Sequence, residues 1–85
     1  MRTPRITQVE TMPGYRLRLT WDTGPVTTVD VSDVVNDLLI FAPLRDEPGL
    51  FDRASVGEDG FCVHWSDLME LSAPNLWQRS QAKAA

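Results

Sequence analysis

The residues with the most chemical potential lie around position 64 of this 85-residue chain. His64 is the one histidine, so it could act as a general base near neutral pH, with Asp67 orienting its ring. Cys62 precedes it by two residues, and such a Cys-x-His pair could contribute to a metal site or an activated thiolate. However, neighbours on one strand face stand ~7 Å apart, and no further Cys or His completes a coordination shell. The pattern therefore favours a polar strand position for His64, and we expect no metal or other cofactor.

Acidic side chains in the middle of the chain offer a second candidate site, because carboxylates are the ligands that magnesium prefers. They are Asp30, Asp33, Asp37, Asp46 and Glu47. Helix caps and solvated helix faces account for carboxylates at such positions more simply. The sequence therefore predicts structural roles for them.

Arginine and tryptophan side chains supply the candidate interaction surface. Arg16 and Arg18 share one strand face and could contact phosphates, although alternating basic residues also keep strand faces soluble. We expect Trp21 and Trp65 to be core residues. Trp77 lies on a terminal helix and is the best candidate for an anchor, because aromatic and Arg side chains dominate interfaces. The predicted surface comprises Trp77, Arg16, Arg18 and Arg45.

Length and charge restrict the classes of protein to which the chain can belong. A chain of 85 residues builds a single core, which predicts one domain. Eight Lys and Arg against twelve Asp and Glu give a net charge of −4, which disfavours nucleic acid as the partner of this chain alone. No apolar run is long enough to span a bilayer, and a lone cysteine fits a reducing compartment. We expect a cytoplasmic protein that does not insert into membranes.

Strand-like alternation dominates the first half of the chain. It predicts three strands, at 5–11, 15–21 and 25–31, and the second is the clearest because apolar and basic residues alternate along it. In the first strand Ile6 and Val9 fall on opposite faces, which indicates an edge position or a β-bulge. A helix is expected from Ser32, with the Ser32 side chain as its cap and Asp33 favoured by the helix dipole.

The second half is predicted to contain short helices and another hairpin. The helix from Ser32 should carry an apolar stripe that ends before Pro43; its members are Val34, Val35, Leu38 and Leu39. Asp46 should cap a single turn that returns Leu50 and Phe51 to the core. Strands at 53–56 and 61–65 form the hairpin, with Phe61, Val63 and Trp65 on one face. A last helix starts near Ser72, with Leu71 and Leu76 as a hydrophobic staple.

These elements predict an α+β fold: a small curved antiparallel sheet, made of a three-strand meander plus a second hairpin, with two or three short helices. The ordered core should cover about 4–79, and residues 80–85 should form a frayed tail.

Several segments together resemble a known family. They are Pro13 to Leu19, Val29 to Ser32, FAPLRDEPGLF from Phe41 to Phe51, and Trp65 after a Gly-closed hairpin. This pattern is similar to the bacterial domain-of-unknown-function family numbered 2442. The resemblance implies a curved antiparallel sheet with short helices, found alone or ahead of a helix-turn-helix segment, and no known activity. Its members often lie in genomes beside another small protein, which implies a paired, toxin-antitoxin-like or regulatory role.

The sequence departs from that pattern after Trp65, where Ser66-Asp67-Leu68 replaces the expected Pro-Asn-Gly-type turn. Three functions stay open at this point. The favoured one is a non-enzymatic interaction or regulatory module that binds another small protein or itself. The alternative is a DNA-associated regulatory domain without its helix-turn-helix part, and the third is a small hydrolase that uses His64.

Overall fold

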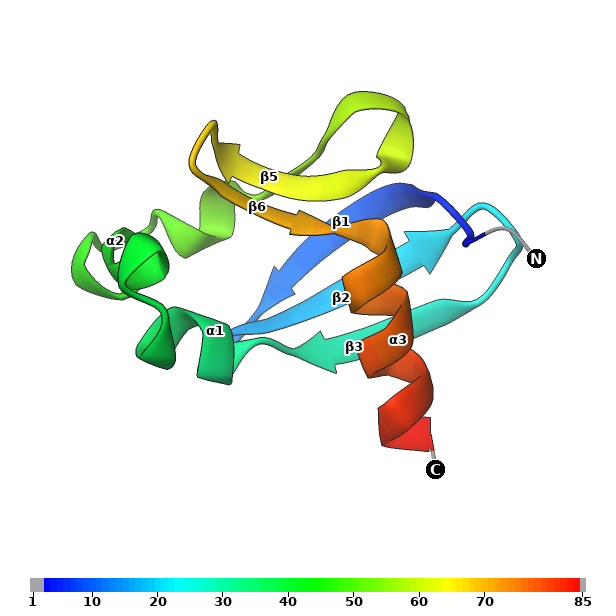
Figure 1. The fold of residues 1–85 in the computed structure, drawn as a ribbon, viewed down its shortest axis with the longest axis horizontal. Helices are drawn as coiled ribbons and strands as arrows, with labels where there is room; N and C mark the ends of the chain where they lie inside the picture. Colours follow the sequence, from blue (N-terminus) through cyan, green and yellow to red (C-terminus); the bar gives the residue numbers. More distant parts are fainter. Residues whose placement is uncertain (1–2, 85) are drawn as a thin grey trace.

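A computed structural model describes residues 3–84 of the chain, with side chains described for residues 3–81. Its first part is an antiparallel sheet in the order β1-β2-β3, formed by β1 (Ile6–Met12), β2 (Arg16–Trp21) and β3 (Val26–Asp30) (Figure 1). The alternation of β2 is confirmed, because Leu17, Leu19 and Trp21 are buried while Arg16 and Arg18 are exposed. The pairing of β1 with β2 shifts register between Ile6 and Gln8, so the expected bulge and edge position are both present.

Four short helical segments follow this sheet and gather at one end of the molecule (Figure 1). They are α1 (Ser32–Asp37), the 3-10 turn η1 (Leu39–Phe41), α2 (Ala42–Asp46) and the 3-10 turn η2 (Phe51–Arg53). Phe51 is buried and Leu50 packs against the core, as expected. The predicted cap at Asp46 is wrong, because Asp46 ends α2, whose first turn contains Pro43.

Helix α1 starts at Ser32, as predicted, but its cap and its end differ from the prediction. The Ser32 side chain does not cap the helix; instead the Asp30 carboxylate accepts the Ser32 amide at 2.8 Å. The helix stops at Asp37 because Leu38 has an extended backbone, with φ −97° and ψ 120°. The predicted apolar stripe is therefore broken: Val34 and Val35 are buried, whereas Leu38 and Leu39 face solvent.

A second antiparallel sheet has the order β4-β5-β6. Its strands are β4 (Ser55–Val56), β5 (Cys62–Ser66) and β6 (Met69–Ser72), with the 3-10 turn η3 (Glu58–Gly60) between the first two. The expected hairpin is present, but β6 was not predicted, so the hairpin is extended to three strands. Phe61 precedes β5 and is exposed, contrary to the prediction, whereas Val63 is fully buried.

The chain closes with α3 (Ala73–Ala84). The Ser72 hydroxyl accepts the Asn75 amide at 3.3 Å, which confirms Ser72 as the cap. Leu71 and Leu76, the two predicted staple positions, are both buried. The helix continues past residue 79, where we expected a frayed tail to begin, and Ser80 is buried against the Leu76 carbonyl at 2.9 Å.

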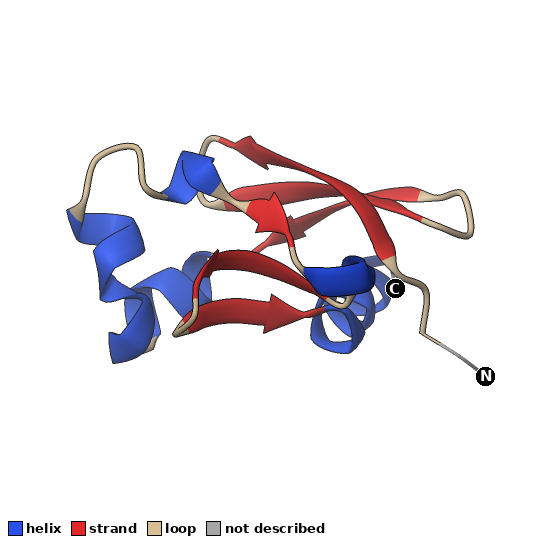
Figure 2. Ribbon diagram, turned by 90° about the horizontal axis from the view of Figure 1, so that it is seen from above, coloured by secondary structure: helices blue, strands red, loops and turns tan. Residues whose placement is uncertain are grey.

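One core joins the two sheets, which lie against each other with the short helices at one end (Figure 2). Its buried residues come from both sheets and from every α-helix. Helix α3 packs against β3 and β6 and so connects one sheet to the other. This arrangement is a small α+β fold, as the alternation and turn residues predicted.

Candidate functional site

The predicted Cys62 and His64 lie on β5, and the structure adds a third residue beside them. Glu70 of β6 pairs across the sheet with His64. Its Oε2 atom lies 3.9 Å from His64 Nε2 and 3.6 Å from Cys62 Sγ, while Asp67 Oδ1 lies 3.8 Å from the same imidazole nitrogen. Sequence reasoning missed Glu70 because the strand that carries it was not predicted.

This cluster is poorly suited to nucleophilic chemistry. Burial, followed by the negative charge of Glu70, raises the pKa of the Cys62 thiol above its usual value. A raised pKa keeps the thiol protonated at neutral pH, whereas reactive cysteines need the thiolate. Within residues 3–84 the structure contains no group of three or more His, Cys, Asp or Glu residues that could hold a metal ion.

Three of the five acidic residues of the second candidate site have separate local partners. Asp33 accepts two hydrogen bonds from the Arg79 guanidinium, at 2.9 and 3.0 Å, and these hold the pKa of its carboxyl below the usual value. Asp30 binds the Ser32 amide, as described above, and Asp46 lies 3.5 Å from Arg45. Each of these three carboxylates therefore has a structural contact, although the cap expected at Asp46 is not formed and the pairing of Asp33 with Arg79 was not predicted.

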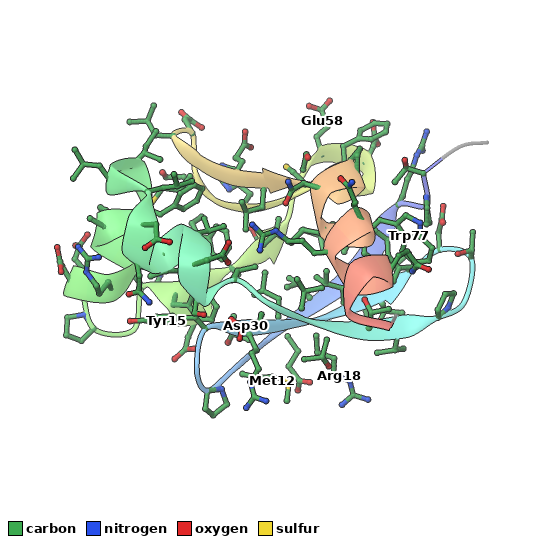
Figure 3. All side chains as sticks on the ribbon, turned by 60° about the horizontal axis from the view of Figure 1, so that its bottom comes forward. Met12, Tyr15, Arg18, Asp30, Glu58 and Trp77 are labelled. Carbon is green, nitrogen blue, oxygen red and sulfur yellow. The ribbon has the colours of Figure 1, made fainter. Side chains whose placement is uncertain are left out.

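The three arginines of the predicted surface do not form one patch. Arg16 and Arg18 are exposed on β2, and Arg18 points away from the body of the molecule (Figure 3). Arg16 donates to the Pro13 carbonyl at 2.9 Å, and Arg18 lies 3.7 Å from Glu10. Arg45 lies on α2 and donates to the Asn36 carbonyl at 3.2 Å.

Trp77 lies at the edge of the core, with part of its ring exposed. Its ring meets Trp21 edge to face, with centroids 5.0 Å apart and planes at 71°. The Trp21 indole in turn donates to the Thr27 hydroxyl at 2.8 Å. The expected position of Trp77 is confirmed, and its role in an interface stays a prediction.

A cavity of about 470 Å³ lies between the β1–β2 turn and the loop that follows α2. Pro13, Gly14 and Tyr15 line one side, and 44–52 supplies the other. Two of the segments that carry the family resemblance therefore meet here. Tyr15 has a left-handed backbone, with φ 56°, and its ring packs edge-on against Phe51 at 5.3 Å. The aromatic contact gives this segment a structural role in closing the core.

Three consecutive exposed apolar residues form a second surface at the same end of the molecule. Leu38, Leu39 and Ile40 are consecutive, and their exposed fractions are 50%, 89% and 50%; we call them the Leu38–Ile40 ridge. Leu38 also lines a groove of about 380 Å³ between α1, β6 and α3. The groove is lined by Val34, Leu38, Phe41, Glu70, Leu71, Ser72, Asn75 and Arg79. Sequence analysis missed this surface because it assigned the two leucines to a buried stripe.

Fold and surface together define a small α+β domain with two three-stranded antiparallel sheets and an apolar ridge beside a groove. The chain belongs to the family described as protein of unknown function (DUF2442), whose model matches residues 6–82. No curated protein matches the sequence. None of the helices in the described part of the chain has the length and apolar character needed to cross a membrane.

One solved structure is similar over nearly the whole chain. It is the crystal structure of "Putative DNA Binding Protein NE0471" from Nitrosomonas europaea ATCC 19718, with a TM-score of 0.84 and 34% sequence identity. The similarity covers 95% of this chain and 51% of that one. This chain therefore spans about half the length of that relative.

Proposed function

We propose that this chain is a non-enzymatic protein-interaction or regulatory module, and that the Leu38–Ile40 ridge is its contact surface. One observation carries the proposal: three consecutive large apolar side chains are each at least half exposed. Scattered single apolar residues are ordinary on protein surfaces, but a contiguous apolar patch next to a groove is typical of an interaction site.

The energy available at this surface is adequate for a partner. Complete burial of a Leu or Ile side chain contributes roughly 1.5–3 kcal/mol, so a partner that covers the ridge gains several kcal/mol before its own costs. A domain of this size also has a limited core, and a partner that binds only the folded state stabilises it further. The partner is another small protein or a second copy of the chain.

The ridge is favoured over the predicted set of Trp77 and the three arginines because each of its apolar side chains is at least half exposed. Trp77 contacts Trp21, and each arginine has a hydrogen bond or an ion pair of its own. A contact surface gains most from side chains whose apolar area is uncovered in the free protein.

Site-specific crosslinking tests this proposal. A photo-crosslinking amino acid at position 39 should give a discrete protein adduct in cells, whereas the same group at the Thr28 position, on the solvent face of β3, should not. If the two positions give the same adducts, or neither gives one, the ridge is not a contact surface. Adducts that contain two copies of this chain would identify the partner as itself.

A DNA-associated regulatory domain is the second candidate, and the name of the 34%-identical relative favours it. The net charge of −4 and the pairing of Arg18 with Glu10 oppose direct contact with phosphates. Fluorescence anisotropy with labelled duplex DNA at low and high salt separates the two candidates. Tight, strongly salt-dependent binding by this chain alone would favour the DNA-associated role.

A further inference from the structure

The groove beside α1 runs along the free edge of β6. Glu70, Leu71 and Ser72 are consecutive and all line it. Successive strand residues point to opposite faces of a sheet, so a groove that touches three in a row must lie along the backbone edge. No other strand within residues 3–84 pairs with β6 on that side, because β6 ends the order β4-β5-β6.

The hydrogen bonds of β5 show which backbone groups of β6 face the groove. The Cys62 carbonyl accepts the Gly57 amide at 2.7 Å, and the His64 carbonyl accepts the Ser55 hydroxyl at 3.3 Å, so both point toward β4. Backbone groups alternate in direction along a strand, so the amide and carbonyl of Val63 point toward β6, where Leu71 is the partner of Val63. The backbone groups of Glu70 and the amide of Ser72 are then directed away from β5.

The charges at the groove select the kind of segment that can pair there. The Arg79 guanidinium is already bound by both oxygens of Asp33. Glu70 has a half-exposed side chain whose carboxylate lies near Cys62 and His64, and it has no Lys or Arg partner within the described residues. A second copy that paired in the register with Glu70 opposite Glu70 would place two like charges directly across from each other, which is destabilising. The groove therefore suits a cationic segment better than another copy of this chain.

We propose that an extended segment of a partner protein adds to β6 as a further strand. Cross-strand neighbours share a face, so the residue opposite Glu70 is Lys or Arg, and the residue opposite Leu71 is apolar and enters the groove. Val34, Leu38 and Phe41 form the far wall of that groove. This mode of binding rests on the proposed interaction function and specifies the chemistry of the partner.

Peptide titration of the isotope-labelled full chain tests the mode directly. The probes are capped hexapeptides with a central Lys-Val or Val-Lys pair flanked by threonines, and the same peptides with Glu in place of Lys. With a Lys peptide, the amide signals of Glu70, Leu71 and Ser72 should shift saturably. The Glu peptides should bind roughly three- to fivefold more weakly, as expected for an exposed ion pair.

Charge reversal provides the matched control. Glu70→Lys should invert the preference, so that the Glu peptides bind more tightly than the Lys peptides. Glu47→Lys makes the same change of net charge at the end of α2 and should leave the preference intact. Strand addition would be overturned if both peptides bound with equal affinity, if the amide shifts were confined to other surfaces, or if no shift occurred at ~5 mM peptide. It would also be overturned if the β6 signals shifted with protein concentration in the absence of peptide. If crosslinking at position 39 still yields a partner, the interaction function survives this failure.

Discussion

The Glu70 carboxylate approaches both Cys62 and His64 from the neighbouring strand. Burial opposes formation of a thiolate at Cys62, and the negative charge of Glu70 opposes it further. In the sequence, the Cys-x-His pattern suggests an activated thiol. In the structure, the surroundings of Cys62 instead disfavour the thiolate. The cluster therefore gives no support to the third function considered, a small hydrolase.

Removal of the Glu70 charge should make Cys62 more reactive. In Glu70→Gln the carboxylate no longer repels the thiolate, so the thiol pKa should fall, although burial still holds it above its usual value. The rate of iodoacetamide alkylation, measured between about pH 7 and 10, should rise at lower pH in the variant than in the wild type. Coincident pH profiles for the two proteins would show that Glu70 does not influence the thiol.

At the scale of elements, α1 and α3 are tied by the pair of hydrogen bonds between Arg79 and Asp33, which are 46 residues apart in sequence. The Arg79 guanidinium also donates to the Asn75 side-chain oxygen at 3.1 Å on its own helix, and this hydrogen bond fixes the orientation of the guanidinium. Bidentate geometry distinguishes this pair from the single, longer contact between Arg18 and Glu10. It fixes the last helix against the short helices and shapes one wall of the groove.

Asp33→Asn should reduce the free energy of unfolding by about 0.5–1 kcal/mol, since the pair is more than half exposed on its acidic side. The pKa of Asp33 is lowered by folding, so its contribution is present above the unfolded value near 3.8 and is lost as the pH falls through the folded value. Urea unfolding should show this difference in unfolding free energy between wild type and Asp33→Asn at about pH 7, and little of the difference at about pH 3.

Asp37→Asn is the matched control, because Asp37 ends the same helix without an Arg partner. Its effect at neutral pH should be smaller than that of Asp33→Asn. An equal loss in the two variants would mean that the contact with Arg79 adds nothing to stability.

For the whole molecule, aromatic rings close the core at two places. Trp65 stacks on Phe51 at 5.7 Å, and its indole donates to the Phe51 carbonyl at 3.0 Å. It also meets Phe41 edge to face at 6.3 Å. Trp65 is partly buried rather than fully inside the core, as is Trp77, but Trp77 makes one ring contact within the described residues, with Trp21. The two tryptophans should therefore differ in what their removal costs.

Trp65→Ala should lower the free energy of unfolding by about 3–5 kcal/mol, because it removes a large packed ring and the hydrogen bond that its indole donates to the Phe51 carbonyl. Trp77→Ala should cost about 1–2 kcal/mol, for one edge-to-face contact and partial burial. Far-ultraviolet circular dichroism in urea measures the unfolding free energies of both variants without relying on tryptophan fluorescence. Equal destabilisation by the two substitutions would show that Trp77 is an ordinary core residue.

The contribution of Trp77 to association is a separate prediction. Sedimentation of Trp77→Ala across a concentration series tests whether this residue contributes more than ~1 kcal/mol to association.

Local patterns in the sequence predicted much of this fold. The alternation from Leu17 to Trp21 was sufficient for β2, because a strand with one buried face needs an apolar residue at every second position. Ser72 was identifiable as a cap because its hydroxyl acts within three residues. The edge position of Trp77 followed from its place one residue after the buried Leu76.

The tertiary structure decided what depends on residues far apart in the chain. The residues of β6 alternate between apolar and polar, but four residues are too few for this alternation to predict a strand, and β6 exists through its pairing with β5. That pairing places Glu70 beside His64 and creates the free edge. The Leu38–Ile40 ridge is exposed because α1 ends at Asp37, although helical spacing alone would have placed Leu38 and Leu39 inside. Local periodicity reports which face of an element is apolar, whereas only packing decides whether another element covers it.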